Sequence, residues 1–524
     1  MRRQQESRRS ESMNAARTQN RTLAWAIAAV LAALCIYLAM RILAAGEWLA
    51  AGAFLAIAGA GFFVYLSNAA FAYRYLYPGL AAMAVFVLFP LLYTAQIGFT
   101  NYSSAHLLSE SRARQYLLDQ VVPDDSRLME FSLHADGSEH RIALRPVVDG
   151  ATGAITHASA PIALKEGIEV AMPRTDAALP PLAKALPLTE VLKHRTALMS
   201  ARLVMPDGVK LQYTGVREFA PVSPLWSAVD GGGVREAATG TVFLPNRDKG
   251  AFESAQGLAL QPGFKVGVGF ANYARMINDA EFRGPFLSIF TWTVVFAGMT
   301  VLFTLAIGMP LAVLLNWESL KYRSIYRTLL FLPYAVPAFI SILVFKGLFN
   351  QNFGEINTLL NAVFGIRPAW FADPTLAKVM ILIVNTWLGY PYVMILCSGL
   401  IKSIPADLYE ASALAGASPW MNFRRITAPL IIKPLAPLLV TIFAFNFNNF
   451  VVIALLTDGR PDHLNTKLPA GTTDILVSYT YRIAFQDSGQ NFGLAAAIST
   501  VIFFMIALMS FANMKVAKMA AGER

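Results

Sequence analysis

The chain has 524 residues, of which 56% are hydrophobic, and its mean hydropathy is +0.48. This composition excludes an ordinary soluble domain and indicates a membrane protein. The net charge of +10 does not indicate nucleic-acid binding, because the basic residues lie at the ends of apolar segments and in short loops, as they do in the cytoplasmic loops of membrane proteins.

The N-terminal region predicts a tail followed by three transmembrane helices. Residues 1–22 are polar and arginine-rich, and we interpret them as a cytoplasmic tail. A cleaved signal peptide is the alternative, but the apolar run that follows has about 20 residues, enough to span a bilayer. Residues 23–100 then contain three apolar segments, with Arg74 in the turn before the third.

Residues 101–283 change in character and predict a β-rich domain inserted between spans three and four. Two hydrophobic alternations flank turn residues, the first around Asp136-Gly137 and the second around Pro206-Asp207-Gly208, which is typical of β-hairpins. A flexible loop is the alternative. A stretch of roughly 180 residues is long enough for its own core.

The membrane core is predicted over 284–524, with spans four to eight at about 285–316, 328–349, 375–400, 432–456 and 491–513. In span five, Pro333 and Pro337 should bend the helix. The predicted fold is therefore an all-α polytopic membrane protein with eight transmembrane helices and the inserted β-rich domain. An even number of spans puts both termini and the basic turns on the cytoplasmic face and the insert outside.

The sequence offers no sign of covalent chemistry. We find no catalytic motif, no metal-ligand spacing and no phosphate-binding loop, and so predict no catalytic residue, metal or cofactor. Cys35 and Cys397 both fall in apolar spans, so we predict no disulfide. Spans four to eight contain no Asp, Glu or His and carry Lys only near their ends, whereas ion-coupled carriers usually need such groups.

Two mid-membrane segments carry the polar and aromatic residues that suit a sugar. In span seven, Ile442, Phe445, Asn446 and Asn449 follow helical spacing and should share one face. An aromatic ring covers the C–H face of a pyranose, and carboxamides donate to and accept from its hydroxyls. The alternative is that the asparagines hold helices together. In span six, Pro391 frees the carbonyl of Trp387, and the residues alone favour a packing kink with aromatic filler over the alternative, a helix broken at mid-membrane.

Residues 405–434 predict two short helices joined at a glycine. Ser403 can cap the first helix, Gly416 can end it, and Ser418-Pro419 can begin the second. A compact hairpin of this kind suits docking into a groove of another protein, although physics alone gives an ordinary interspan loop equal weight.

The loop at 402–431 resembles the EAA loop of binding-protein-dependent ABC importer permeases. Glu410-Ala411-Ser412 is followed after three residues by Gly416 and after nine more by Ile426, with Pro429 closing the pattern. Ser412 and Ala428 are the two departures, and both are small residues. The resemblance implies that Glu410, Ala411, Ser412 and Gly416 couple the chain to a cytoplasmic ATPase.

Several further segments resemble the maltose/maltodextrin permeases of this family: NTWLGYPYV, FAFNFNNFV, PAGTTDILVSYTYRIAF and FGLAAAI. The resemblance implies a transmembrane maltose site and an insert that contacts a periplasmic binding protein. Ile442 departs from the serine that the resemblance leads us to expect, which leaves the range of sugars open. The implied substrate-binding residues are Trp387, Leu388, Gly389, Tyr392, Phe445, Asn446 and Asn449.

The resemblance also implies the assembly: a second homologous permease subunit, a homodimeric cytoplasmic ATPase, a periplasmic maltose-binding protein and the bilayer of a bacterial inner membrane. ATP hydrolysis would then belong to the partner and not to this chain. Three alternatives stay open: an importer permease for another oligosaccharide such as trehalose, a secondary sugar carrier, and a membrane-anchored interaction or sensor protein.

Overall fold

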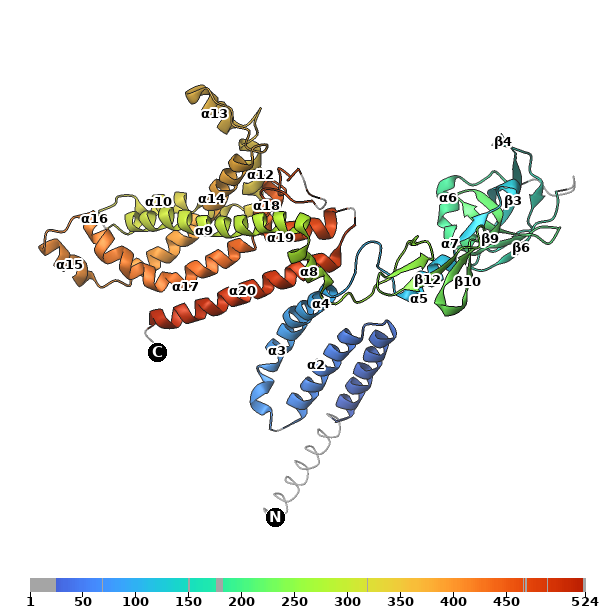
Figure 1. The fold of residues 1–524 in the computed structure, drawn as a ribbon, viewed down its shortest axis with the longest axis horizontal. Helices are drawn as coiled ribbons and strands as arrows, with labels where there is room; N and C mark the ends of the chain where they lie inside the picture. The colour runs from blue at the N-terminus through green and yellow to red at the C-terminus, as the bar shows by residue number, and fades with distance from the viewer. Residues whose placement is uncertain are drawn as a thin grey trace, which may run out of the picture. The chain divides into compact units, whose positions relative to one another are not determined.

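The computed structural model describes residues 25–67, 69–148, 151–175, 182–317, 319–464, 466, 469–487 and 489–521. The tail predicted at 1–22 lies outside these residues. The described chain forms two compact units, drawn in Figure 1: a membrane unit that ends at Ser104 and resumes at Gly267, and an inserted unit over Ala105–Val266.

The membrane unit is built from long apolar helices. Seven helices of the described residues are long and apolar enough to cross a membrane, and one shorter apolar helix is present. The seven are Trp25–Ala44, α2 (Trp48–Leu66), Tyr77–Gly98, α9 (Ala280–Asn316), α14 (Pro374–Ile401), Pro419–Phe447 and α20 (Phe492–Ala521); the shorter one is α12 (Ala338–Leu348). Tyr77–Gly98 consists of α3 (Tyr77–Met83), η2 (Ala84–Leu88) and α4 (Phe89–Gly98), and Pro419–Phe447 consists of α16 (Pro419–Asn422), η5 (Phe423–Thr427) and α17 (Ala428–Phe447). The chain is therefore a mostly helical membrane protein with seven to eight apolar helices.

The predicted fifth span is not one bent helix. The structure divides it into α10 (Arg323–Leu330), α11 (Leu332–Ala335) and α12. Val336 has extended φ and ψ of −97° and 130°, the conformation that a following proline imposes. Pro337 therefore breaks the span between α11 and α12.

The pairing of α9 with α14 depends on two glycines. A Cβ atom at Gly308 would lie 2.9 Å from the amide nitrogen of Met394, and one at Gly389 would lie 2.9 Å from the Cγ2 atom of Thr304. The two helices thus approach where side chains are absent, as small residues allow in membranes. Of the two alternatives at Pro391, the broken helix is excluded: α14 continues through this proline, because one lost hydrogen bond does not end a helix packed along its length.

The predicted seventh span is broken instead. Helix α17 (Ala428–Phe447) ends at Asn448, and α18 (Phe450–Leu456) begins after Asn449. The face assumed for Ile442, Phe445, Asn446 and Asn449 is therefore not one continuous helical face. Asn449 precedes the second helix, where its φ of −76° and ψ of 74° are not helical.

The inserted unit confirms the predicted β-rich domain, and its main sheet has nine strands. Both predicted hairpins are confirmed: Phe131 pairs with Leu144 around the first turn, and Leu203 pairs with Leu211 around the second. These residues lie in one buried cluster together with Phe219. A second, four-stranded sheet packs with α5 (Glu110–Leu118) around Trp226, Phe243 and Phe252.

The strands follow the order β4-β3-β2-β9-β8-β7-β6 in the large sheet, with β1 beside β9 and β5 beside β3. The strands are β1 (Val121–Pro123), β2 (Met129–Asp136), β3 (Glu139–Val148), β4 (Ala151–Thr152), β5 (His157–Ala158), β6 (Glu169–Ala171), β7 (Arg202–Val204), β8 (Lys210–Gly215), β9 (Glu218–Pro224), β10 (Trp226–Ala228), β11 (Val234–Glu236), β12 (Val242–Asn246) and β13 (Ala251–Ser254). The shorter helices of this unit are α6 (Leu188–Lys193) and α7 (Arg195–Ser200).

The insert is shorter than the 101–283 predicted. Residues from Gly267 belong to the membrane unit, where α8 (Ala271–Asn278) leads directly into α9. The remaining helices of the membrane unit are η1 (Phe71–Arg74), α13 (Glu355–Phe364), α15 (Ala406–Leu414), α19 (Leu476–Tyr481) and η6 (Arg482–Gln486).

Candidate functional site

Three helices meet at a network of side-chain amides inside the membrane unit. Asn385 on α14 donates through Nδ2 to the Thr300 hydroxyl of α9 at 3.0 Å and to Oδ1 of Asn446 at 2.7 Å. Asn449 donates through Nδ2 to Oδ1 of Asn385 at 3.1 Å. Asn385 is therefore the centre of the network. It connects α9 and α14 to the break between α17 and α18.

The amides differ in what they can still offer a ligand. Asn385 and Asn446 are each only 4% exposed, and Asn446 also donates to the Ile442 carbonyl at 2.8 Å. Asn449 is half-buried, and its side-chain amino group donates one hydrogen bond, to Asn385. Its second side-chain N–H and its Oδ1 atom can then still bind a ligand. Asn446 thus serves helix packing in this arrangement, and Asn449 is the asparagine with capacity for a sugar hydroxyl.

The aromatic residues predicted for the site are more accessible than the amides. Phe445 is 69% exposed and Tyr392 is 40% exposed. Trp387 is half-buried and meets the Phe345 ring of α12 edge-on, with ring centroids 5.0 Å apart. Phe445 and Tyr392 therefore have ring surface that the rest of the described chain does not cover.

Two predicted site residues take packing positions. Leu388 packs against the buried cluster that contains Phe296 and Ile342, and Gly389 lies in the close contact with Thr304. Sequence reasoning missed Asn385 and Thr300 as members of the site. The signal for Asn385 was present, since an uncharged amide in the middle of an apolar span is costly unless it is paired.

The second candidate site is the hairpin of α15 and α16 (Pro419–Asn422), which lies at one end of the membrane unit beyond α17 (Figure 1). Gly416 ends α15 with φ +73°, and the Ser418 hydroxyl accepts from the Met421 amide at 3.3 Å to cap α16. The Tyr409 hydroxyl is 2.9 Å from the Thr427 hydroxyl, which ties α15 to the start of the following span. A glycine therefore joins α15 to a second helix, as predicted, but that second helix is not short, because α16 is the first turn of the continuous helix Pro419–Phe447.

One predicted detail of the hairpin is wrong. Ser403 does not cap α15; its hydroxyl donates to the Leu400 carbonyl at 2.7 Å and so satisfies the end of α14.

The residues predicted to couple the hairpin to an ATPase differ in exposure. Glu410 and Ala411 are exposed, whereas the Ser412 hydroxyl donates to the Tyr409 carbonyl at 2.9 Å. Apolar side chains are also exposed on the hairpin, namely Leu414 at 92% and Trp420 at 69%.

The loop before α20 contains a buried ion pair that sequence reasoning also missed. Asp474 is fully buried and lies 2.9 Å from Nη1 of Arg482, whose Nη2 lies 2.7 Å from Asp462. The Ser478 hydroxyl and the Gly471 amide donate to the same Asp474 carboxylate, each at 2.8 Å. Both Nη atoms of Arg482 and the Asp474 carboxylate are thus paired, whereas the buried Nε of Arg482 has no hydrogen-bond partner among the described residues.

Known proteins match both units of the chain. The family described as "Maltose transport system permease protein MalF P2 domain" matches residues 108–269, and "Binding-protein-dependent transport system inner membrane component" matches residues 304–520. The maltose/maltodextrin transport system permease protein MalF of Klebsiella aerogenes is 48% identical over 508 residues, which is 96% of this chain and 98% of the relative. The MalF proteins of Escherichia coli K12 and Salmonella typhi are each 47% identical with the same coverage.

The apolar helices and the matched region 304–520 define an inner-membrane component of a binding-protein-dependent transport system. Within that class, the matched insert and the full-length similarity are decisive. The chain belongs to the MalF family of maltose/maltodextrin transport system permease proteins.

Proposed function

We propose that the chain is the permease subunit of an ATP-driven importer that moves maltose and maltodextrins across the bacterial inner membrane. The observation that carries the proposal is the 48% identity to a maltose/maltodextrin permease over 96% of this chain. The match includes the inserted unit, which is the part of the fold that a generic permease core does not require.

The proposed assembly adds a second, MalG-like permease, a MalK-like ATPase dimer and a periplasmic maltose-binding protein. The 405–434 hairpin docks into the ATPase through Glu410, Ala411, Ser412 and Gly416, and its exposed Leu414 and Trp420 supply apolar contact. Both termini are then cytoplasmic, and the insert over 105–266 faces the periplasm and the binding protein. ATPase closure and the sugar-loaded binding protein must favour the same state of the permease if hydrolysis is to drive uptake.

The proposed sugar site uses Trp387, Tyr392, Phe445 and Asn449 as contacts, with Asn446 held by Asn385. Their exposure and remaining hydrogen-bonding capacity support these roles. Leu388 and Gly389 shape the site from the α9–α14 contact. A second candidate substrate is another oligosaccharide such as trehalose, because Ile442 stands where the resemblance leads us to expect a serine. Ile442 packs on the apolar cluster around Met394 and Leu435.

Reconstitution tests the proposal. The chain is placed in proteoliposomes with the second permease and the ATPase, and uptake of labelled maltose is measured with the binding protein outside. We expect uptake that requires ATP and the ATPase and that survives dissipation of the membrane potential. Uptake without the ATPase that stops when the potential is dissipated would identify a secondary carrier, and stronger uptake of trehalose than of maltose would identify the other substrate.

A further inference from the structure

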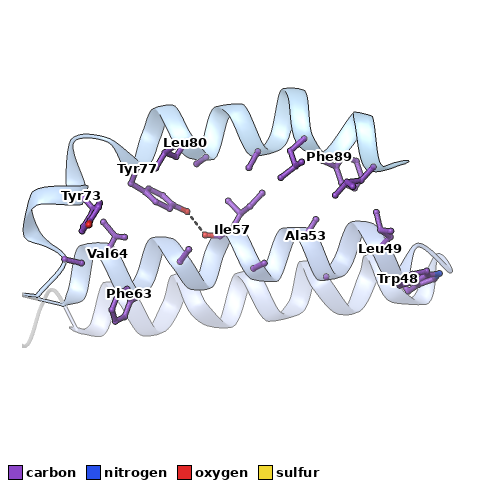
Figure 2. Close-up of a pocket in the computed structure, with 18 of the residues that line it drawn as sticks. Trp48, Leu49, Ala53, Ile57, Phe63, Val64, Tyr73, Tyr77, Leu80 and Phe89 are labelled. Atoms are coloured by element: carbon purple, nitrogen blue, oxygen red, sulfur yellow. Dashed lines mark hydrogen bonds between the residues drawn. The ribbon is translucent and has the colours of Figure 1, made fainter. Parts of the chain in front are cut away.

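A long apolar groove lies between α2 and the helix that runs from Tyr77 to Gly98 (Figure 2). Its volume is about 890 Å³, within the range of roughly 300–1,000 Å³ that is typical of ligand pockets. Helix α2 has 19 residues, so it is about 28 Å long, close to the hydrocarbon thickness of a bilayer of about 30 Å. The groove therefore extends over the depth at which acyl chains lie.

The lining of the groove suits hydrocarbon. Gly52, Ala56 and Ala60 of α2 follow one another at four-residue spacing and leave room beneath Leu80 and Phe89 of the facing helix. The Tyr77 hydroxyl reaches across the groove but already donates to the Ile57 carbonyl, as Figure 2 shows. The groove walls thus favour an apolar occupant over a polar one.

One end of the groove carries a positive charge. The Arg74 guanidinium donates through Nε to the carbonyl of Val64, which lines the groove, at 3.2 Å, and through Nη2 to the Ser67 carbonyl at 3.3 Å. It also lies over the Phe71 ring, 5.1 Å from the centroid. A guanidinium has five N–H donors, so Arg74 can hold these two carbonyls and still bind a phosphate oxygen. The neighbouring Tyr73 lines the same end, and tyrosine is enriched where hydrocarbon meets headgroups.

We propose that this groove is a binding site for an anionic phospholipid, with one acyl chain along α2 and the phosphate at Arg74. The apolar lining accounts for the chain, and the charge at one end accounts for the headgroup. The alternative occupant is a transmembrane helix of a partner protein, because small residues such as those of α2 also allow helices to pack closely. A helix brings no phosphate, so the dependence on Arg74 separates the two occupants.

The test uses the full-length chain in its assembled transporter, incorporated in nanodiscs of phosphatidylglycerol and phosphatidylcholine in equal amounts. Native mass spectrometry of the released complex counts the lipids that remain bound. Gly52→Leu fills the groove, and Gly59→Leu is its matched control. A Cβ atom built on either glycine meets no neighbouring atom within 4 Å, but Gly59 is exposed and does not line the groove. Arg74→Gln removes the headgroup contact, and Arg41→Gln removes an exposed arginine of the preceding helix, Trp25–Ala44.

We expect the wild-type complex to retain phosphatidylglycerol in preference to phosphatidylcholine. Gly52→Leu and Arg74→Gln should each reduce the retained phosphatidylglycerol by about tenfold, the effect of losing one charge-assisted hydrogen bond or its equivalent in packing. The two control variants should retain it as the wild type does. The proposal would be overturned if the wild-type complex retained both lipids equally, or if all four variants retained as much phosphatidylglycerol as the wild type. It would also be overturned if the Gly52→Leu complex lost the second permease instead of lipid.

Discussion

The asparagines of the seventh span have different surroundings, although they stand close together in the sequence. Asn446 is buried and shares a hydrogen bond with Asn385, whereas Phe445 beside it is 69% exposed. A buried amide that loses its partner costs about 1–3 kcal/mol, but an exposed ring contributes little to packing. Mutation can therefore separate the buried residues of this segment, which hold helices together, from the exposed residues, which contact the sugar in the proposed site.

The first prediction uses this separation. Phe445→Ala should strongly reduce maltose uptake and leave the yield of assembled transporter unchanged, because the exposed ring has ligand contact to lose and no core to disturb. Asn446→Ala should lower the assembled yield, because Asn385 is left with an unpaired buried N–H. Uptake per assembled complex and yield after detergent extraction measure the two effects. Normal uptake in the assembled Phe445→Ala transporter would remove that ring from the sugar site.

Ile442 offers a second prediction at this scale. The proposed sugar site is expected to carry a serine at this position, and Ile442 instead extends the apolar cluster around Met394. Ile442→Ser should change the ratio of maltose uptake to trehalose uptake, because it exchanges apolar bulk for a hydroxyl. An unchanged ratio, measured by competition with unlabelled sugars, would mean that position 442 does not face the substrate.

The hairpin of α15 and α16, which we propose docks into the ATPase, depends on one backbone conformation. Gly416 has φ +73°, and a Cβ atom built there meets no other atom within 4 Å. Glycine is therefore required here because of the positive φ and not because a side chain would clash, since a β-branched residue at positive φ is strongly disfavoured. The angle between α15 and α16 thus depends on a single residue.

The third prediction follows from that dependence. Gly416→Val should destabilise the hairpin by about 1–2 kcal/mol and reduce sugar-stimulated ATPase activity, because the strained turn misplaces α15 against α16. Gly399→Val is the matched control, since Gly399 is an exposed glycine inside α14 with open space around its Cβ. Gly416→Asn should retain most activity, because asparagine tolerates positive φ. Wild-type coupling in Gly416→Val would argue against this hairpin as the docking element.

Sequence reasoning succeeded where the determinants were local. The two β-hairpins and the α15–α16 hairpin were predictable because their turn residues stand within a few positions of the elements they join. It failed to find the break in the seventh span. Pro391 leaves α14 intact, while the seventh span breaks beside Asn448, where the partners of Asn446 and Asn449 come from 61 and 64 residues away. Contacts at that distance in the sequence leave no periodic signal.

At the scale of the whole molecule, the chain consists of two units with separate cores. The inserted unit buries Phe131, Leu133, Leu144 and Phe219 in a cluster of its own residues, while α9 and α14 belong to clusters of the membrane unit. A unit of this size with its own core can fold alone.

The fourth prediction is that residues 105–266, expressed alone, fold as they do in the full chain. The isolated unit should give dispersed NMR signals that do not change on addition of reductant, because it contains no cysteine. A random-coil spectrum from this fragment would contradict the prediction and would mean that the membrane unit is needed to order the sheet.

The last prediction concerns the pH dependence of that isolated unit. Burial, together with the His194 ring 4.6 Å away, lowers the pKa of His140, and burial also lowers the pKa of His106 and of His157. The unfolded chain, with imidazole pKa values of about 6.5, then binds more protons than the folded unit below that pH. Stability is therefore fully present above about pH 6.5 and is lost as the pH falls through that value toward the lowered folded-state pKa values. Urea unfolding at pH 7.5 and 5.5 should show the loss, and His140→Gln should make it smaller by removing one titrating group. A urea midpoint at pH 5.5 that equals or exceeds the midpoint at pH 7.5 would show that the fold does not oppose protonation of these rings.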